Sequence, residues 1–134
     1  MEQAISQHDE AARTQALRGA ERMALNLLDA IEDAQFIQAG RTEREIELDI
    51  RALAREKFGI ERDWHKRIVR TGINTLSVAA DNPPIRTVED DDIVFLDLGS
   101  VFEEWEADVG RSYAWATIPA SIRFARSYRA SLRR

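Results

Sequence analysis

The sequence predicts an α+β fold in which two N-terminal helices are followed by an antiparallel sheet. Apolar residues recur every three or four positions through the first 58 residues, which is typical of amphipathic helices. After Gly59, apolar runs are instead bounded by Gly, Pro, Asn and Asp, as in strands and turns. A chain of 134 residues suits one domain, so we expect residues 1–134 to fold as a single unit.

A long amphipathic helix is predicted from about Asp9 to Gln38. Its apolar positions follow the helical period without an intervening proline, and they are Ala16, Ala20, Met23, Leu27, Leu28, Ile31 and Ala34. Gly40 is expected to end this helix, because glycine readily adopts the left-handed conformation found after helix C-termini. Residues 1–8 are expected to be a flexible N-terminus.

A second helix is predicted to follow at once and to run to about Phe58. Thr42 and Glu45 have the Thr-x-x-Glu spacing of a capping box, in which each side chain bonds the other residue's backbone N–H. The apolar stripe of this helix comprises Ile46, Ile50, Leu53, Ala54 and Phe58. Gly59 is its expected stop.

The remainder of the chain reads as strands joined by loops. Residues 65–70 form a plausible strand, and residues 71–74 contain the Gly and Asn of a turn. The Asp-Asn-Pro-Pro sequence at 81–84 breaks any regular element, because proline restricts both itself and the residue before it. An acidic loop ending at residue 92 then leads into a strong strand at 93–101.

Composition excludes several classes of function. The chain is 44% hydrophobic and 32% charged, as in globular proteins, and its net charge of -5 argues against nucleic-acid binding. It has no cysteine, which excludes disulfides, thiolate metal sites and a cysteine nucleophile. The N-terminus lacks the pattern of a signal peptide, and no apolar run approaches the roughly 18 residues of a membrane span. We therefore expect a cytoplasmic protein with no membrane contact.

The charge is unevenly distributed along the chain. Its last twelve residues carry five arginines and no acid. Such a segment can bind acidic partners, but at this length we interpret residues 117–134 as a basic C-terminal helix or tail in contact with solvent.

Two acids indicate a metal site. Asp97 ends the apolar run that starts at Ile93, and Asp108 follows eleven residues later. If residues 92–115 form a hairpin that turns between Phe102 and Glu103, the numbers of paired residues sum to 205, and the two acids lie directly opposite each other. Opposed Cβ atoms are then about 4.5–5.5 Å apart. Two carboxylates inside an apolar hairpin repel each other unless a cation lies between them, which favours a divalent metal.

Other arrangements of these acids remain open. Asp97 could end its strand in a turn while Asp108 pairs with Arg111 or another cation on the surface. The glutamates at 103, 104 and 106 also allow other loop lengths, and a shift of the turn by one residue would move the two acids apart. In those cases the acid pair would be incidental to a soluble α+β domain.

The segments Asp91–Gly99 and Ala107–Tyr113 resemble the metal-binding hairpin of the pita-bread metallopeptidases, which include methionine aminopeptidase, aminopeptidase P, prolidase and creatinase. In that family an acidic loop precedes a strand ending in a ligand Asp, and a second Asp is soon followed by Arg-Thr or Arg-Ser. The Gly-x-Asn sequence at residues 72–74 also fits. The resemblance covers roughly residues 15 to 116 and implies a truncated domain, the N-terminal half of a pita-bread fold.

By this resemblance, Asp97 would be a bidentate or bridging ligand and Asp108 a bridging ligand of a dinuclear site. The metals would be Mn, Co, Zn or Fe, and they would activate a shared water to attack an amide carbonyl. The implied substrate is a peptide with a free N-terminus or an Xaa-Pro bond.

The sequence departs from the family in its other ligands. Family members add a His and two Glu from the second half of the fold, whereas this chain has no His after His65 and no Glu after Glu106. The family's substrate-contacting His would fall about 18 residues before Asp97, where the chain reads Leu-Ser-Val-Ala-Ala. His65 lies too far upstream to align with it and is only a weak candidate for substrate binding.

These departures predict an incomplete Xaa-Pro aminopeptidase or prolidase-like domain. It keeps two Asp ligands, has no assigned catalytic residue and would be inactive alone, with weak metal binding. The alternative is a non-catalytic binding or self-association module. In that case a homodimer or a partner chain would cover the exposed sheet.

Overall fold

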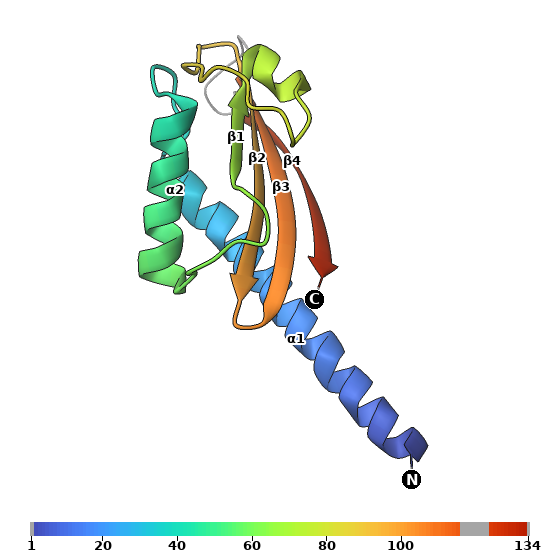
Figure 1. Cartoon of the computed structure of the whole chain (residues 1–134). Helices are drawn as coiled ribbons and strands as arrows, with labels where there is room; N and C mark the ends of the chain where they lie inside the picture. The colour runs from blue at the N-terminus through green and yellow to red at the C-terminus, as the bar shows by residue number, and fades with distance from the viewer. Residues whose placement is uncertain (1, 116–123, 134) are drawn as a thin grey trace.

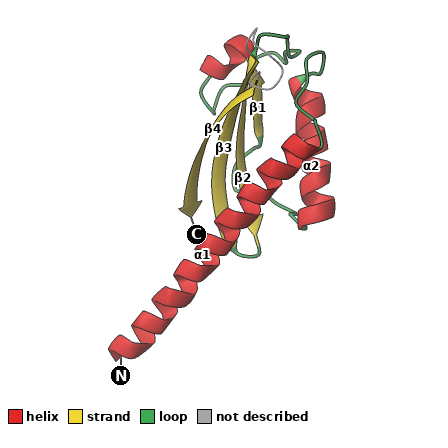
Figure 2. Cartoon of the chain, turned by 180° about the vertical axis from the view of Figure 1, so that it is seen from behind, coloured by secondary structure: helices red, strands yellow, loops and turns green. Residues whose placement is uncertain are grey.

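The computed structural model describes residues 2–115 and 124–133, which form two α-helices, a short 3-10 helix and a four-stranded antiparallel sheet (Figure 1). The sheet order is β1-β2-β3-β4, and all three pairings are antiparallel. Both helices lie on the same face of the sheet, as the view from behind shows (Figure 2). The elements in chain order are α1 (Glu2–Asp33), α2 (Glu43–Phe58), β1 (Ile68–Thr71), η1 (Gly72–Leu76), β2 (Ile93–Phe102), β3 (Trp105–Trp115) and β4 (Phe124–Arg133). The predicted α+β class with two helices before the sheet is confirmed.

Helix α1 is longer at its start and shorter at its end than the sequence predicts. Residues 2–8 are helical rather than a separate flexible terminus, and the first half of α1 projects beyond the sheet (Figure 1). The helix ends at Asp33, because Gln35 already adopts a left-handed φ of 56° before Gly40 is reached. Burial begins at Ala20 and continues through Ala24, Leu27, Leu28 and Ile31, which pack against the sheet.

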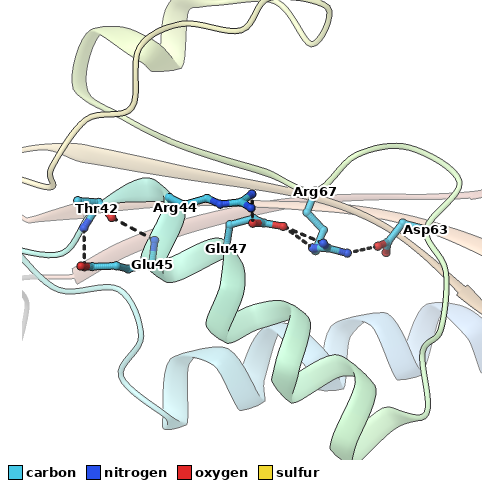
Figure 3. Close-up of polar contacts among 6 residues, drawn as sticks. All are labelled: Thr42, Arg44, Glu45, Glu47, Asp63 and Arg67. Carbon is cyan, nitrogen blue, oxygen red and sulfur yellow. Dashed lines mark hydrogen bonds and ion pairs between the residues drawn. The ribbon is translucent and has the colours of Figure 1, made fainter.

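Helix α2 has the predicted boundaries and caps. The Glu45 N–H donates to Thr42 Oγ1 over 3.1 Å, and the Thr42 N–H donates to Glu45 Oε2 over 3.0 Å (Figure 3). Gly59 ends the helix in the left-handed conformation, with φ of 64°. The predicted stripe is buried at Ile46, Ile50, Leu53 and Ala54.

The sheet has two chemically different faces. We call the face under the helices the helix face; its side chains on β2 and β3 include Val94, Leu96, Leu98, Val109 and Tyr113, all buried in one core with α1 and α2. We call the opposite face of these strands the site face; it includes Phe95, Asp97, Gly99, Asp108 and Gly110.

The register of the β2–β3 hairpin corrects the prediction. Phe102 pairs with Trp105, so the turn lies between Glu103 and Glu104, and the numbers of paired residues sum to 207 instead of 205. Phe102 and Trp105 both pack against the core from the helix face, and this aromatic pair closes the hairpin one residue later than expected. The error shifts every pairing by two residues, so each side chain stays on its predicted face.

Three other segments differ from the prediction. The first strand begins at Ile68 rather than His65, and residues 72–76 form η1 instead of an open turn. In the C-terminal segment, read from sequence as a basic helix or tail, residues 124–133 form strand β4 along β3, while residues 116–123 and 134 lie outside the described part. Strand β4 therefore covers the edge of β3.

Candidate metal centre

Asp97 and Asp108 lie on the site face as a diagonal pair on adjacent strands. Asp97 is opposite Gly110, and Asp108 is opposite Gly99, so the directly opposed arrangement is wrong while the shared face is right. Their side chains are 30% and 24% exposed, which leaves the carboxylates accessible to an ion from solvent. Diagonal neighbours on a sheet remain within reach of each other's side chains.

A bulge before β1 brings His65 over these acids. Asp63 pairs with Ser100 in an isolated β-bridge, and Ile68 pairs with Asp97. The chain therefore advances five residues from Asp63 to Ile68 while β2 advances only three between their partners. Two extra residues therefore bulge out of the ladder, and Figure 1 shows this segment swinging across the front of β2. Bulges of this kind redirect side chains next to functional sites.

Gly99 makes room for the bulged segment. A Cβ atom built on Gly99 would lie 2.3 Å from His65 Cδ2 and 2.7 Å from Trp64 Nε1, both far inside normal contact distance. The backbone N–H of Trp64 also donates to the Gly99 carbonyl over 2.9 Å. A side chain at position 99 would therefore collide with the His65 ring where it lies beside the acids.

The three side chains converge on one point. His65 Nε2 is 3.2 Å from Asp108 Oδ1 and 3.6 Å from Asp97 Oδ1. One ligand atom from each residue lies within 4.8 Å of those of the other two, and all three side chains are partly buried. His65, which the sequence analysis treats as a weak substrate-binding candidate distant from the acids, is in contact with both of them.

Ion pairs with α2 hold the loop that carries His65. Arg67 donates to Glu47 Oε1 from Nε and Nη2, over 2.9 and 2.8 Å, and its Nη1 bonds Asp63 (Figure 3). Arg44 also donates to Glu47 over 2.9 Å. These contacts connect both ends of the bulge to a capped helix, so the His65 backbone is fixed relative to the sheet.

Arg111 does not neutralise the acids on the site face. Its side chain points to the helix face, where Nη1 donates to Asp29 Oδ1 over 3.0 Å and to Glu32 Oε2 over 2.9 Å. Burial alone would lower the pKa of Arg111, but its hydrogen bond to Asp29 and the charge interactions with Tyr113 and Glu32 raise that pKa above its ordinary value. The surface pair between Asp108 and Arg111 that the sequence left open is therefore not formed.

Comparisons with known proteins identify the family of this chain. The model of metallopeptidase family M24 matches residues 15–133 of the chain. The chain belongs to metallopeptidase family M24. The match extends past residue 116, where the resemblance read from the sequence ended, and includes all of β4. No curated protein matches the chain.

Solved structures of M24-type enzymes share the fold. An X-Pro aminopeptidase from Thermotoga maritima superposes with a TM-score of 0.67 at 22% identity, covering 84% of this chain and 31% of that one. A prolidase from Thermococcus sibiricus gives 0.62 at 22% identity, covering 81% and 30%. A dipeptidase from Pyrococcus horikoshii gives 0.63 at 24% identity, covering 79% and 28%. The chain spans about 30% of the length of these proteins, and its fold is a partial pita-bread fold.

The sequence singles out Asp97 and Asp108 but not the histidine that lies beside them. His65 is separated from Asp97 by 32 positions and from Asp108 by 43, and no periodic pattern connects them. The available signal is Gly99, a glycine inside an apolar strand, which often marks a close approach by another segment. Within the described residues, no helix has both the length and the apolar character needed to cross a membrane.

Proposed function

We propose that this chain is the metal-binding half of an M24 hydrolase of the Xaa-Pro aminopeptidase or prolidase type. Asp97 and Asp108 would hold a divalent ion, with Mn, Co, Zn and Fe as the candidates. The observation that supports this is the convergence of two partly exposed carboxylates and an imidazole on one face of a sheet. Carboxylate and imidazole groups are suitable ligands for these ions.

Such an ion would supply the chemistry of amide hydrolysis. A bound divalent metal lowers the pKa of a coordinated water and polarises an amide carbonyl. The role of this chain's own residues is to position: β2 and β3 hold the two carboxylates at a fixed separation, and the bulge holds His65 above them. The substrate would be a peptide, and the absence of cysteine is in keeping with a cytoplasmic setting.

The polypeptide tested alone is expected to be inactive. It contains no His after His65 and no Glu after Glu106, so it cannot supply the His and two Glu that the family resemblance calls for. We expect no turnover of Xaa-Pro or Met-initiated peptides with Mn²⁺ or Co²⁺ present. Metal-dependent turnover that disappears in Asp97→Asn would contradict this part of the proposal.

Metal binding is tested by thermal unfolding during titration with Mn²⁺ or Co²⁺. An ion that binds only the folded state at 100 times its Kd adds about 2.7 kcal/mol to the free energy of unfolding. We expect a concentration-dependent rise in Tm for the wild type and none for Asp97→Asn/Asp108→Asn.

The matched control for that titration is Asp9→Asn/Asp33→Asn, which removes two exposed carboxylates from α1. The control should respond to metal like the wild type. If the site variant and the control both respond like the wild type, the two acids do not form a metal site.

Self-association is the second candidate function. The site face carries the partly buried Phe95 and lies opposite the face covered by α1 and α2 (Figure 2), and a second copy could pack against it. A dimer in light scattering at tens of micromolar would support this candidate. A monomer would count against it without affecting the metal proposal.

A further inference from the structure

We propose that His65 is itself a metal ligand, so that His65, Asp97 and Asp108 form a three-ligand site for one ion, built entirely from this chain. This inference rests on the proposed metal-binding role of the two acids. It adds a nitrogen donor from the bulge before β1, a segment that lies outside the hairpin carrying the acids.

The distances between the ligand atoms fit a single ion. Zinc and similar ions lie about 2.0–2.2 Å from nitrogen and oxygen ligands, so ligand atoms around a tetrahedral ion are about 3.3–3.6 Å apart. His65 Nε2 lies 3.2 Å from one carboxylate oxygen and 3.6 Å from the other. The carboxylate oxygens lie no more than 4.8 Å from each other, so a small rotation of one Asp side chain completes the triangle.

The ring orientation points the correct nitrogen at the acids. His65 Nδ1 is 2.6 Å from the Lys66 carbonyl oxygen. A carbonyl only accepts hydrogen bonds, so Nδ1 carries a hydrogen, and Nε2 is the ring nitrogen that faces the carboxylates. A metal-bound histidine characteristically donates its other N–H to a carbonyl in this way.

The imidazole is also held in place before any ion binds. The Trp64 ring lies edge-on to His65 with 4.7 Å between the ring centroids, and the backbone N–H of Trp64 donates to the Gly99 carbonyl. The absence of a side chain at Gly99 leaves the space that the His65 ring occupies, because a Cβ there would overlap the ring. A site fixed by backbone bonds and packing loses little conformational entropy when it binds an ion.

The donor set selects a class of ion. One imidazole nitrogen and two carboxylate oxygens suit borderline divalent ions such as Zn²⁺ and Co²⁺, whereas Mg²⁺ and Ca²⁺ prefer oxygen ligands alone. Three protein ligands leave a coordination position open to water.

The test uses Co²⁺ as the probe, with calorimetry for affinity and proton NMR for the ligand. The chain has only two histidines, His8 and His65. If His65 binds Co²⁺ through Nε2, the exchangeable N–H on Nδ1 is shifted by the paramagnetic ion far outside the normal spectral range. We expect one such resonance in the wild type and in the control His8→Gln, and none in His65→Gln.

Two variants test the geometry by different routes. His65→Gln should weaken Co²⁺ binding at least about tenfold, as expected for loss of a metal ligand. Gly99→Ala keeps the imidazole but displaces it from the acids, so it should weaken binding similarly and abolish the shifted resonance. Far-UV circular dichroism checks that both variants fold, and the wild-type NMR result stands even if neither does.

The outcomes separate this inference from the proposed function. If Asp97→Asn/Asp108→Asn loses Co²⁺ binding while His65→Gln keeps wild-type affinity and the wild type shows no shifted N–H, His65 is only an ion-pair partner and the inference fails alone. If the Asp variant also keeps wild-type affinity, the proposed function fails with it.

Discussion

The two faces of the β2–β3 hairpin use charge in opposite ways. On the helix face, one buried arginine is paired with two carboxylates from α1, and apolar side chains surround it. On the site face, two carboxylates meet one histidine, and glycines at 99 and 110 replace large side chains. The charge on the helix face thus has fixed partners on α1, while the carboxylates on the site face are partly exposed to solvent. We infer that the first face stabilises the fold and that the second is shaped for a ligand.

The strongest way to break this comparison is to open a cavity on the helix face. Leu98 is 1% exposed within the core. Leu98→Ala should lower the free energy of unfolding by about 3 kcal/mol, because it removes buried methyl groups and leaves a void. Urea denaturation measures this, and Ile93→Ala, at a 52% exposed position, is the matched control with an expected change below about 1 kcal/mol. Equal effects would show that the helix face is not the main core.

A second test removes the charge from the helix face. Arg111→Met should lower the free energy of unfolding by about 2 kcal/mol. This is less than the usual effect of breaking a fully buried ion pair, because the Asp29 side chain is 59% exposed and water can solvate it. Because the pKa of Arg111 is raised in the folded state, the charged side chain adds to the free energy of unfolding at every pH below the ordinary pKa of arginine. This stabilisation is lost only at still more alkaline pH. The loss measured by urea denaturation should therefore stay constant from about pH 5 to 9; a loss confined to one end of that range would contradict it.

Removing a charge from the site face should change the free energy of unfolding little when no metal is present. Asp108→Asn removes a partly exposed ion pair with His65, and such pairs contribute about 1 kcal/mol or less. Urea denaturation in a chelating buffer should give a change within about 1 kcal/mol, and the metal-induced rise in Tm should be lost. A cost as large as that of Leu98→Ala would mean that the acids support the fold.

The smallest expected effect concerns the turn that sets the register of both faces. Glu103 adopts φ of 59°, a conformation that favours glycine. Glu103→Gly should stabilise the hairpin by about 0.5 kcal/mol, because it relieves the left-handed strain and offsets the greater flexibility of glycine. Glu104→Gly is the control and should destabilise it slightly. If the two variants behave alike in thermal unfolding, the turn is not centred where the register places it.

Much of the fold could be predicted because its signals are local. The Thr42–Glu45 capping box, the Gly59 stop and the β2 strand each depend on residues only a few positions apart. The sequence could also place Asp97 and Asp108 on one face, because side chains alternate along strands whether the register sums to 205 or 207. It could not select the turn, because Glu103 gives no sign of its left-handed backbone and the pairing of Phe102 with Trp105 depends on the core beneath them.

The sequence by itself therefore determined the helices, the strand faces and the pair of acids, since helix and strand periods are properties of neighbouring residues. Only the tertiary structure decided that the acids are diagonal, that β4 covers the edge of β3, and that His65 lies above Asp97 and Asp108. For His65 the physical reason is the bulge before β1. Two unpaired residues carry His65 across the strand to the space over Gly99, and that placement depends on the β-ladder and on the anchoring of Arg67 to α2.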